Sequence, residues 1–347
     1  MGGTIGIFVG SASSFNLGRE ALNFGKALSS GFTTHLIATD AGFAADVSAA
    51  YDGVHGPLEP CSLRGEVSAL RSYVHSHDPD ALFQITSPPI HGNIVGSLGK
   101  IHGIPFVYRY SGDRFYEHEV SRGVTKLIHF GLNNVLGRFP LYLADGYVTL
   151  GPRGQRRLEN RGVAPDEITI IPPLVDQDRF STSIAESDGG TPVGLFVGRL
   201  SRRKGIETLE RTLPEILQRR SDIEFLLVGK PQESIEIPAE YSHRVTVAGT
   251  VPPTEIPAYY EHADFLVHPT LTDGLARVVL EALASDIPPI ARDVGDIAYA
   301  TQNTFQTDRE FIEMVCDFES LNVDSNDSFT LDTLRNEYVE LFEGLLQ

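Results

Sequence analysis

Short buried-strand patterns alternate with longer amphipathic patterns along most of this chain. Six stretches in the first half, rich in β-branched and aromatic residues, are typical of strands: 4–10, 34–40, 81–86, 105–110, 146–150 and 168–172. Amphipathic stretches such as 18–30 and 66–76 lie between some of them. Strands that alternate with helices in this way form parallel sheets covered by helices on both faces. The pattern therefore predicts an α/β fold.

A break near residue 172 divides the chain. Two prolines and a polar, glycine-containing run up to residue 192 are typical of a linker. A second alternating set then follows. We predict two doubly wound Rossmann-like domains that face a cleft, where ligands bind beyond the carboxyl ends of the strands. The predicted divisions are an N-terminal domain at 1–172, a linker at 173–190, a second domain at 191–325 and a closing helix at 326–347.

Composition narrows the class of protein. The net charge of −18 argues against nucleic-acid binding, which needs a basic face. Only 5 of the 28 basic residues are lysine, and a lysine-poor acidic surface is typical of a salt-adapted (haloarchaeal-like) organism, with an ordinary acidic protein as the alternative. No apolar run reaches about 18 residues, and the first apolar stretch lacks a preceding basic region. We therefore expect a cytoplasmic protein, with a peripheral position at the cytoplasmic membrane face as the alternative.

The segment GRLSRRKG at 198–205 joins a predicted buried strand to a predicted helix. Arg199 and Lys204 then stand at a strand end beside a helix N-terminus, where free N–H groups and a partial positive charge favour phosphate. Arginine binds phosphate through two parallel hydrogen bonds, whereas lysine acts as a point charge. Residues 192–220 carry seven basic and three acidic side chains, a net +4, which favours an anionic ligand. A solvated basic loop is the alternative.

A second segment, 268–296, places two carboxylates around a glycine. Asp273 precedes a predicted helix, and Glu281 lies eight positions later inside that helix. Gly274 between them lets backbone N–H groups approach a ligand closely. A carboxylate on the helix accepts hydroxyl hydrogen bonds, as acidic residues do for ribose in other nucleotide folds. By itself Asp273 could equally cap the helix.

Taken together, these segments resemble the retaining GT-B glycosyltransferases of family 4, the glycosyl transferases group 1. The resemblance covers nearly the whole chain and is strongest over 194–296, through GRLSRRKG, LLVGKP at 226–231 and LEALASDIPPIA at 280–291. The closing stretch YVELFEGLL at 338–346 resembles the family's final helix, which returns to the N-terminal domain. The resemblance implies a GT-B fold with an acceptor-binding first domain and a donor-binding second domain.

The resemblance also implies roles for individual residues. Arg199 and Lys204 would hold the diphosphate, Glu281 the ribose, and Asp273 would lie near the donor sugar in place of a glutamate. The predicted catalytic group is Asp113, Arg199, Lys204 and Asp273. The predicted donor-binding group is Asn16, Gly18, Gly198, Gly229, Val251, Pro252, Gly274, Leu275, Ala276 and Glu281.

The implied activity is transfer of a hexose, with retention, from a nucleotide-diphosphate-sugar to a glycan or lipid-linked acceptor. Surface glycan, glycoprotein or polysaccharide biosynthesis would use such a reaction. No metal or other cofactor is expected, and the D-x-D at 176–178 is expected not to bind metal because it lies at the domain junction. Because Asp273 is shorter than glutamate, an inactive sugar-nucleotide-binding partner subunit is an alternative, and a sugar-nucleotide epimerase of the same fold is another.

The first domain contributes weaker candidates. Asp113 follows the predicted strand 105–110 and is expected near the acceptor, with a simple turn as the alternative. Asn16 and Gly18 lie in the first predicted loop. His91 and His118 are single histidines, which are more often structural groups.

Residues 119–136 show an amphipathic helical pattern. Val124 and Leu127 mark one face, whereas Arg122 and Lys126 mark the other. The ordinary expectation is a helix packed on its own sheet. The alternative is peripheral membrane contact through 119–143, near a lipid-linked acceptor.

Overall fold

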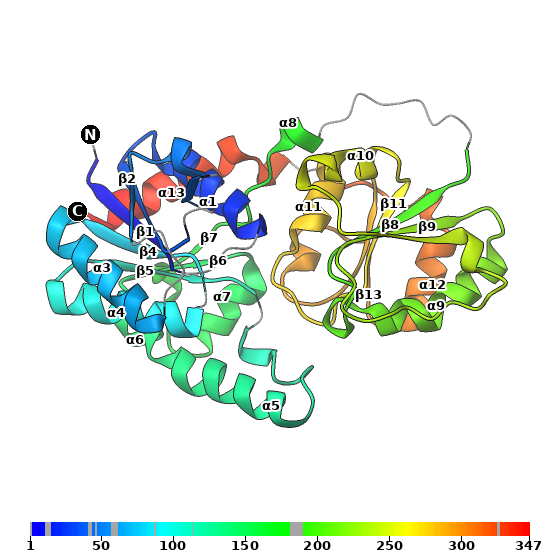
Figure 1. Ribbon diagram of the computed structural model, residues 1–347, viewed down its shortest axis with the longest axis horizontal. Helices are drawn as coiled ribbons and strands as arrows, with labels where there is room; N and C mark the ends of the chain where they lie inside the picture. Colours follow the sequence, from blue (N-terminus) through cyan, green and yellow to red (C-terminus); the bar gives the residue numbers. More distant parts are fainter. Residues whose placement is uncertain are drawn as a thin grey trace. The chain divides into compact units, whose positions relative to one another are not determined.

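The computed structural model describes residues 2–10, 15–40, 44–45, 47–56, 62–86, 88–112, 114–180, 190–324 and 327–347. The chain folds into two compact units, one formed by residues 1–174 and 331–347 and the other by residues 175–330. Each unit is built around one parallel sheet (Figure 1). The predicted α/β fold with two Rossmann-like domains is therefore confirmed.

The N-terminal unit contains seven strands in the spatial order β3-β2-β1-β4-β5-β6-β7. They are β1 (Thr4–Gly10), β2 (Thr33–Ala38), β3 (Gly53–His55), β4 (Ala81–Gln84), β5 (Phe106–Tyr110), β6 (Gly146–Thr149) and β7 (Ile168–Ile170). Six of them coincide with the predicted strands, and the short edge strand β3 is the one the sequence pattern missed. Three residues with partly exposed side chains give too short a pattern to detect.

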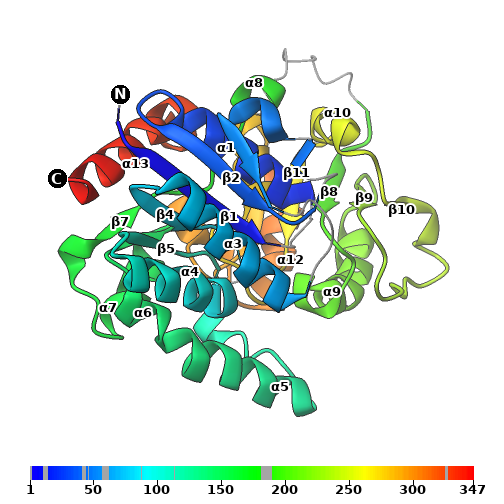
Figure 2. The same ribbon diagram turned by 60° about the vertical axis from the view of Figure 1, so that its left-hand side comes forward.

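Helices cover both faces of this sheet (Figure 2). They include α1 (Phe15–Leu28), α3 (Leu63–His77), α4 (Pro88–His102), α6 (Pro140–Leu143), α7 (Pro152–Glu159) and α13 (Leu331–Leu345). The last of these, α13, lies beside α1, and its Tyr338 ring meets the Phe24 ring edge-on with centroids 5.2 Å apart. Phe342 packs likewise on Phe83 of β4. The prediction that the closing helix returns to the N-terminal domain is therefore confirmed.

The second unit contains six strands in the order β10-β9-β8-β11-β12-β13. They are β8 (Val193–Val197), β9 (Glu224–Val228), β10 (Val245–Gly249), β11 (Phe265–His268), β12 (Pro289–Arg292) and β13 (Thr304–Phe305). Its helices are α8 (Gln177–Phe180), α9 (Ile206–Arg219), α10 (Ile256–Glu261), α11 (Arg277–Ala284) and α12 (Asp308–Cys316). In this strand order β8 and β11 are neighbours, so the loops that follow them lie at the same edge of the sheet.

The segment after residue 119 differs from the expected helix. It forms α5 (Gly123–Phe130), a π-helical turn at Gly131–Val135, a 3₁₀ turn at Leu136–Arg138, and α6. No residue of α5 is buried, so this helix does not pack on its own sheet as the ordinary expectation had it. Within the described ranges, no helix is both long and apolar enough to span a membrane.

Candidate functional site

Glycines bring the carboxyl ends of β8 and β9 into contact. Gly229, which follows β9, has a φ of +141°, and a Cβ atom there would lie only 1.9 Å from the carbonyl oxygen of Gly198. Gly198 itself follows β8 with a φ of +155°. A side chain at Gly229 is therefore excluded by contact as well as by conformation. The structure thus brings these two predicted donor-binding residues together at one edge of the sheet.

The basic loop after β8 is fixed against the loop after β11. Arg202–Lys204 form a 3₁₀ turn, and Gly205 ends it in a left-handed conformation with a φ of +86°. A Cβ atom at Gly205 would lie 2.1 Å from the carbonyl oxygen of Pro269. In addition, the Leu271 N–H donates to the carbonyl of Arg203 at 2.9 Å. The two loops therefore form one unit, although about 65 positions separate them along the chain.

Lys204 and Asp273 form an ion pair within this unit. The Lys204 Nζ lies 2.5 Å from the Asp273 Oδ2, and both side chains are mostly buried. The other carboxylate oxygen accepts a hydrogen bond from the Gly274 N–H at 3.1 Å. Both oxygens of Asp273 thus have protein partners. Two residues predicted separately, for diphosphate and for sugar, are neighbours.

A buried histidine completes this group. The His268 Nε2 lies 3.4 Å from the Asp273 Oδ2, and its side chain is 1% exposed. Burial lowers the pKa of His268, and the nearby carboxylate only partly offsets this effect. Burial by itself would raise the pKa of Asp273, but the Lys204 ammonium and the His268 ring outweigh it, so the pKa lies below its usual range. The Asp273 carboxylate is therefore charged at neutral pH.

The helix that follows, α11, begins without a side-chain cap. Its N-cap residue is Ala276, which makes no side-chain cap hydrogen bond. Asp273 is therefore not the helix cap that the sequence allowed as an alternative. Leu275 and Ala276 have buried side chains. Only their backbone N–H groups, together with the first turn of α11, are suited to an anion.

Gly295 packs closely against the loop that contains Asp273 and Gly274. Gly295, with a φ of +55°, lies where a Cβ atom would come within 2.2 Å of the Asp273 carbonyl oxygen. The next residue, Asp296, donates its N–H to the carbonyl of Gly274 at 3.0 Å. The loop carrying the Lys204–Asp273 pair is thus held on two sides. Gly295 and His268 carry no signal of a role in the sequence, because only the fold places them beside Asp273.

Glu281 lies inside α11 and is buried, with 5% of its surface exposed. The hydroxyl of Tyr260 on α10 donates to the Glu281 Oε2 at 3.1 Å. Tyr260 is itself fully buried and packs edge-on against Phe180 of α8. The carboxylate is therefore held in a fixed orientation by a neighbour that sequence spacing did not reveal.

The remaining predicted donor residues lie at the same strand ends. Arg199 directly follows Gly198 and is exposed, and among the described residues it has no carboxylate partner. Val251 and Pro252 follow β10, at the start of the 3₁₀ turn Pro253–Glu255. This position beside β9 places them at the carboxyl edge, next to Gly229 in the strand order.

In the N-terminal unit, Asp113 lies outside the described residues, and the side chain of Asn16 does too. Gly18 lies on α1 and is partly buried. The His118 Nδ1 donates to the carbonyl oxygen of Phe115 at 3.0 Å, which is a local structural contact.

His91 is buried at the carboxyl ends of β1 and β4. Its Nδ1 lies 2.6 Å from the Thr86 hydroxyl, and its Nε2 lies 3.2 Å from the Glu66 Oε2. A Cβ atom at Gly10 would meet the His91 ring at 2.8 Å. The described side chains therefore account for both ring nitrogens, which fits the structural role expected for a single histidine.

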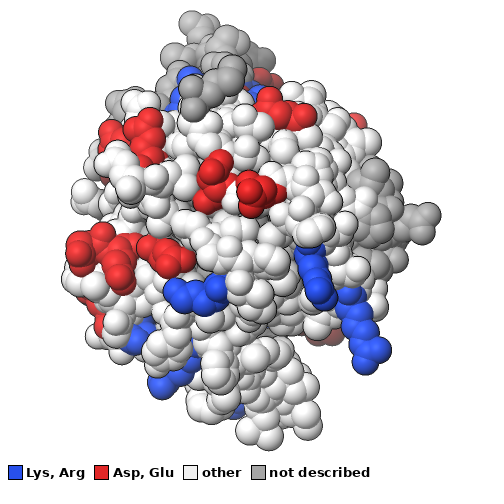
Figure 3. Space-filling model, turned by 90° about the vertical axis from the view of Figure 1, so that its left-hand side faces the viewer, with Lys and Arg blue, Asp and Glu red and all other residues white. Residues whose placement is uncertain are grey.

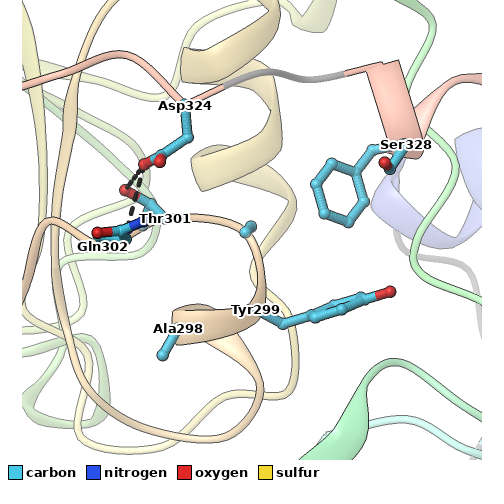
Figure 4. Close-up of a pocket in the computed structure, with 8 residues that line it drawn as sticks. Ala298, Tyr299, Thr301, Gln302, Asp324 and Ser328 are labelled. Atoms are coloured by element: carbon cyan, nitrogen blue, oxygen red, sulfur yellow. Dashed lines mark hydrogen bonds between the residues drawn. The ribbon is translucent and has the colours of Figure 1, made fainter.

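A pocket of about 300 Å³ in the second unit does not include the residues discussed above (Figure 4). It is lined by Ala298–Gln302, Asp324, Ser328 and Phe329. Asp324 closes one side by accepting hydrogen bonds from the Thr301 hydroxyl at 2.8 Å and the Gln302 N–H at 3.1 Å. The candidate site is therefore the strand edge with Lys204 and Asp273, where the charged groups converge.

A strand edge with paired glycines, a basic loop and an uncapped helix defines a nucleotide-binding type of α/β domain. Residues 191–316, which contain that edge, match the family model described as glycosyl transferases group 1. The whole chain also superposes on two-domain structures of low sequence identity. HepE of Anabaena, in complex with UDP-glucose, has a TM-score of 0.72 and 16% identity, with 99% of this chain and 100% of that chain covered. The chain therefore has a GT-B fold, and its residues 191–316 are similar to the glycosyl transferases group 1.

Relatives of similar sequence are glycosyltransferases. The chain is 28% identical over 215 residues to the 2-deoxystreptamine glucosyltransferase of Streptomyces kanamyceticus, covering 57% of this chain and 55% of that protein. It is 31% identical over 180 residues to the D-inositol 3-phosphate glycosyltransferase of Nocardia farcinica, covering 46% and 40%. The match thus spans about half, or less, of these relatives. Sucrose-phosphate synthase of Thermosynechococcus elongatus shares the fold, with a TM-score of 0.70, 20% identity, and 99% and 95% of the two chains covered.

Proposed function

We propose that the chain is a glycosyltransferase of family 4. It would transfer a sugar, expected to be a hexose, from a nucleotide-diphosphate-sugar to a glycan or lipid-linked acceptor, with retention at the anomeric carbon. The observation that carries this proposal is the Lys204–Asp273 pair, 2.5 Å apart, beside the uncapped start of α11. A cation fixed next to a helix N-terminus suits a diphosphate, and a carboxylate beside it suits sugar hydroxyls.

In this proposal the donor lies along the carboxyl edge of the second sheet. The diphosphate would contact Lys204, the exposed Arg199 and the N–H groups at the start of α11. The ribose hydroxyls would bind Glu281, whose carboxylate the Tyr260 hydroxyl holds in place. The base would lie near Val251 and Pro252, after β10.

The reaction then needs no protein nucleophile. The bond between the anomeric carbon and the diphosphate oxygen breaks, and the acceptor oxygen bonds to the same face of the sugar. The acceptor proton passes to the leaving diphosphate, so that charge and atoms balance. Lys204 and Arg199 would stabilise the charge that develops on the leaving group, an effect of about 10²–10³ in rate for one well-placed donor.

The test is release of nucleoside diphosphate by the purified protein, measured with UDP- and GDP-sugars and a panel of sugar acceptors. Lys204→Met is expected to lower turnover at least about 100-fold. The matched control is Lys100→Met, because Lys100 lies on the surface of the other unit, 3.7 Å from its partner Asp145. Full transfer activity in Lys204→Met would refute the proposed role of this lysine.

One observation favours a second candidate, a sugar-nucleotide-binding subunit without transfer activity. Both carboxylate oxygens of Asp273 already have protein partners. Such a subunit would be stabilised by a nucleotide-sugar in a thermal-shift experiment yet release no diphosphate with any acceptor. Conversion of the nucleotide-sugar into an isomer without acceptor would instead indicate an epimerase.

A further inference from the structure

The segment 124–142, between β5 and β6, exposes many of its apolar side chains. The described residues include fourteen large apolar side chains that are exposed, and eight of them lie within nineteen consecutive positions. We call these eight the 124–142 apolar surface: Val124, Leu127, Ile128, Phe130, Val135, Leu136, Phe139 and Tyr142. Val124, Leu127 and Tyr142 are each more than 70% exposed. So dense a cluster is unusual, because exposed apolar residues are normally scattered singly.

Two uncharged polar side chains of the same segment are instead hydrogen-bonded within the unit. Asn133 is 5% exposed, and its Nδ2 donates to the Glu117 Oε2 at 3.3 Å. The His129 Nδ1 lies 2.7 Å from the Ser121 hydroxyl. The segment is thus attached to its unit through hydrogen bonds, the reverse of an ordinary surface helix, which buries its apolar face. The outward apolar face is therefore specified by the fold and is not left over from poor packing.

Basic side chains accompany this surface. Within 119–143 the charged residues are Arg122, Lys126, Arg138 and Glu119, three basic and one acidic, a net +2 in a chain of net −18. All three basic residues are exposed. α5 lies at the lower edge of its unit in Figures 1 and 2, and the lower part of Figure 3 is largely white, with Lys and Arg near it.

We propose that the 124–142 apolar surface docks on a lipid bilayer that contains anionic lipids. Large apolar side chains would enter the boundary between headgroups and acyl chains, while the long basic side chains reach back to the lipid phosphates. Charge complementarity favours an anionic bilayer over a two-fold dimer through this surface, in which the basic side chains of the two copies would face one another. The inference rests on the proposed function in one respect, because docking would bring the enzyme to a lipid-linked acceptor.

The chain contains no tryptophan, which allows a direct test. Leu127→Trp places one fluorophore in the apolar surface, and Val247→Trp is the matched control, at an exposed apolar position of the second unit. With vesicles of phosphatidylglycerol and phosphatidylcholine, we expect a blue shift for the Leu127→Trp protein and none for the control. An unshifted spectrum at low salt for Leu127→Trp would overturn the proposal.

Co-sedimentation with the same vesicles gives an independent measure. Leu127→Gln with Phe139→Gln is expected to lower vesicle binding at least about tenfold, since each change removes a side chain that would be buried in the bilayer. Both positions are exposed, so the fold should be unaffected, as circular dichroism will show. Equal binding by this double variant would also refute the proposal, as would a vesicle-free dimer that the same changes abolish.

These experiments separate docking from the proposed reaction. The docking variants should retain full diphosphate release with a soluble acceptor, because none of the changed residues lies at the donor site. Vesicle binding without any transfer activity would leave docking intact and refute the proposed function. Transfer activity without vesicle binding would refute docking and leave the proposed function intact.

Discussion

The Lys204–Asp273 pair should contribute measurably to the stability of the second unit. At 2.5 Å, Coulomb's law gives about 1.7 kcal/mol in water and about 6.6 kcal/mol at an effective dielectric constant of about 20. The two side chains are 18% and 24% exposed, so desolvation offsets much of this attraction. We therefore expect a coupling free energy of about 2 kcal/mol, between the values typical of exposed and buried pairs.

A double-mutant cycle measures this quantity. Lys204→Met, Asp273→Asn and the double variant are unfolded with urea at pH 7 and followed by circular dichroism, and the coupling is the deviation from additivity. The control cycle is Arg219→Met with Glu215→Gln, an exposed pair on α9 that should give about 0.3–0.5 kcal/mol. A coupling at Lys204–Asp273 no larger than this control would refute the reasoning.

The same pair predicts a dependence on pH. The folded-state pKa of Asp273 lies below its unfolded value, so its contribution is fully present above about pH 4 and is lost as the pH falls through the folded value. Without Lys204, less charge opposes the effect of burial, so the folded-state pKa of Asp273 is higher than in the wild type. Lys204→Met should therefore lose less stability than the wild type when the pH is lowered from 4 to 2.

Three further outcomes are expected. Gly229→Ala should destabilise the protein by more than about 3 kcal/mol, since the new Cβ would lie 1.9 Å from a carbonyl oxygen, whereas Gly103→Ala, with a φ of +72° and open space around it, should cost only about 1 kcal/mol by urea unfolding. Burial, with two neighbouring imidazoles, lowers the pKa of His55 to about 4, so the unfolded chain binds a proton there between about pH 6.5 and 4 that the folded chain does not. Stability should fall as the pH is lowered through that window, and His55→Phe should reduce the fall, by on the order of 1 kcal/mol. Phe342→Ala should cost about 3–5 kcal/mol, because α13 supplies this fully buried ring to the N-terminal core, and a change below about 1 kcal/mol by urea unfolding would show that the helix is dispensable.

Much of the fold follows from local properties of the sequence. Strand and helix patterns are periodicities of two and 3.6 residues, so they can be read along a short window. Helix α11 follows Asp273 and contains Glu281, as the pattern predicted. The strands β3 and β13 were missed because three and two residues are too few to show a period.

The candidate site was predicted less completely. The segments around Arg199 and Asp273 can be recognised from their residue types alone. Both contain glycine where the backbone must approach a ligand closely. The partners of those residues did not follow from sequence. His268, Tyr260 and Gly295 act through contacts with residues distant in the chain, and spacing along a sequence carries no information about such contacts.

The sequence by itself determined two parallel α/β sheets, the basic and acidic loops at their strand ends, and a helix that closes the chain. Each of these features depends on the period of the hydrophobic residues, on the position of a glycine or on the charge of neighbouring residues, all of which are local in the sequence. Only the tertiary structure decided that Lys204 pairs with a carboxylate 69 positions away, and that α5 turns its apolar face outward. An amphipathic pattern has the same period whichever face of the helix is buried. Which face becomes buried depends on the neighbouring elements that the fold places against the helix.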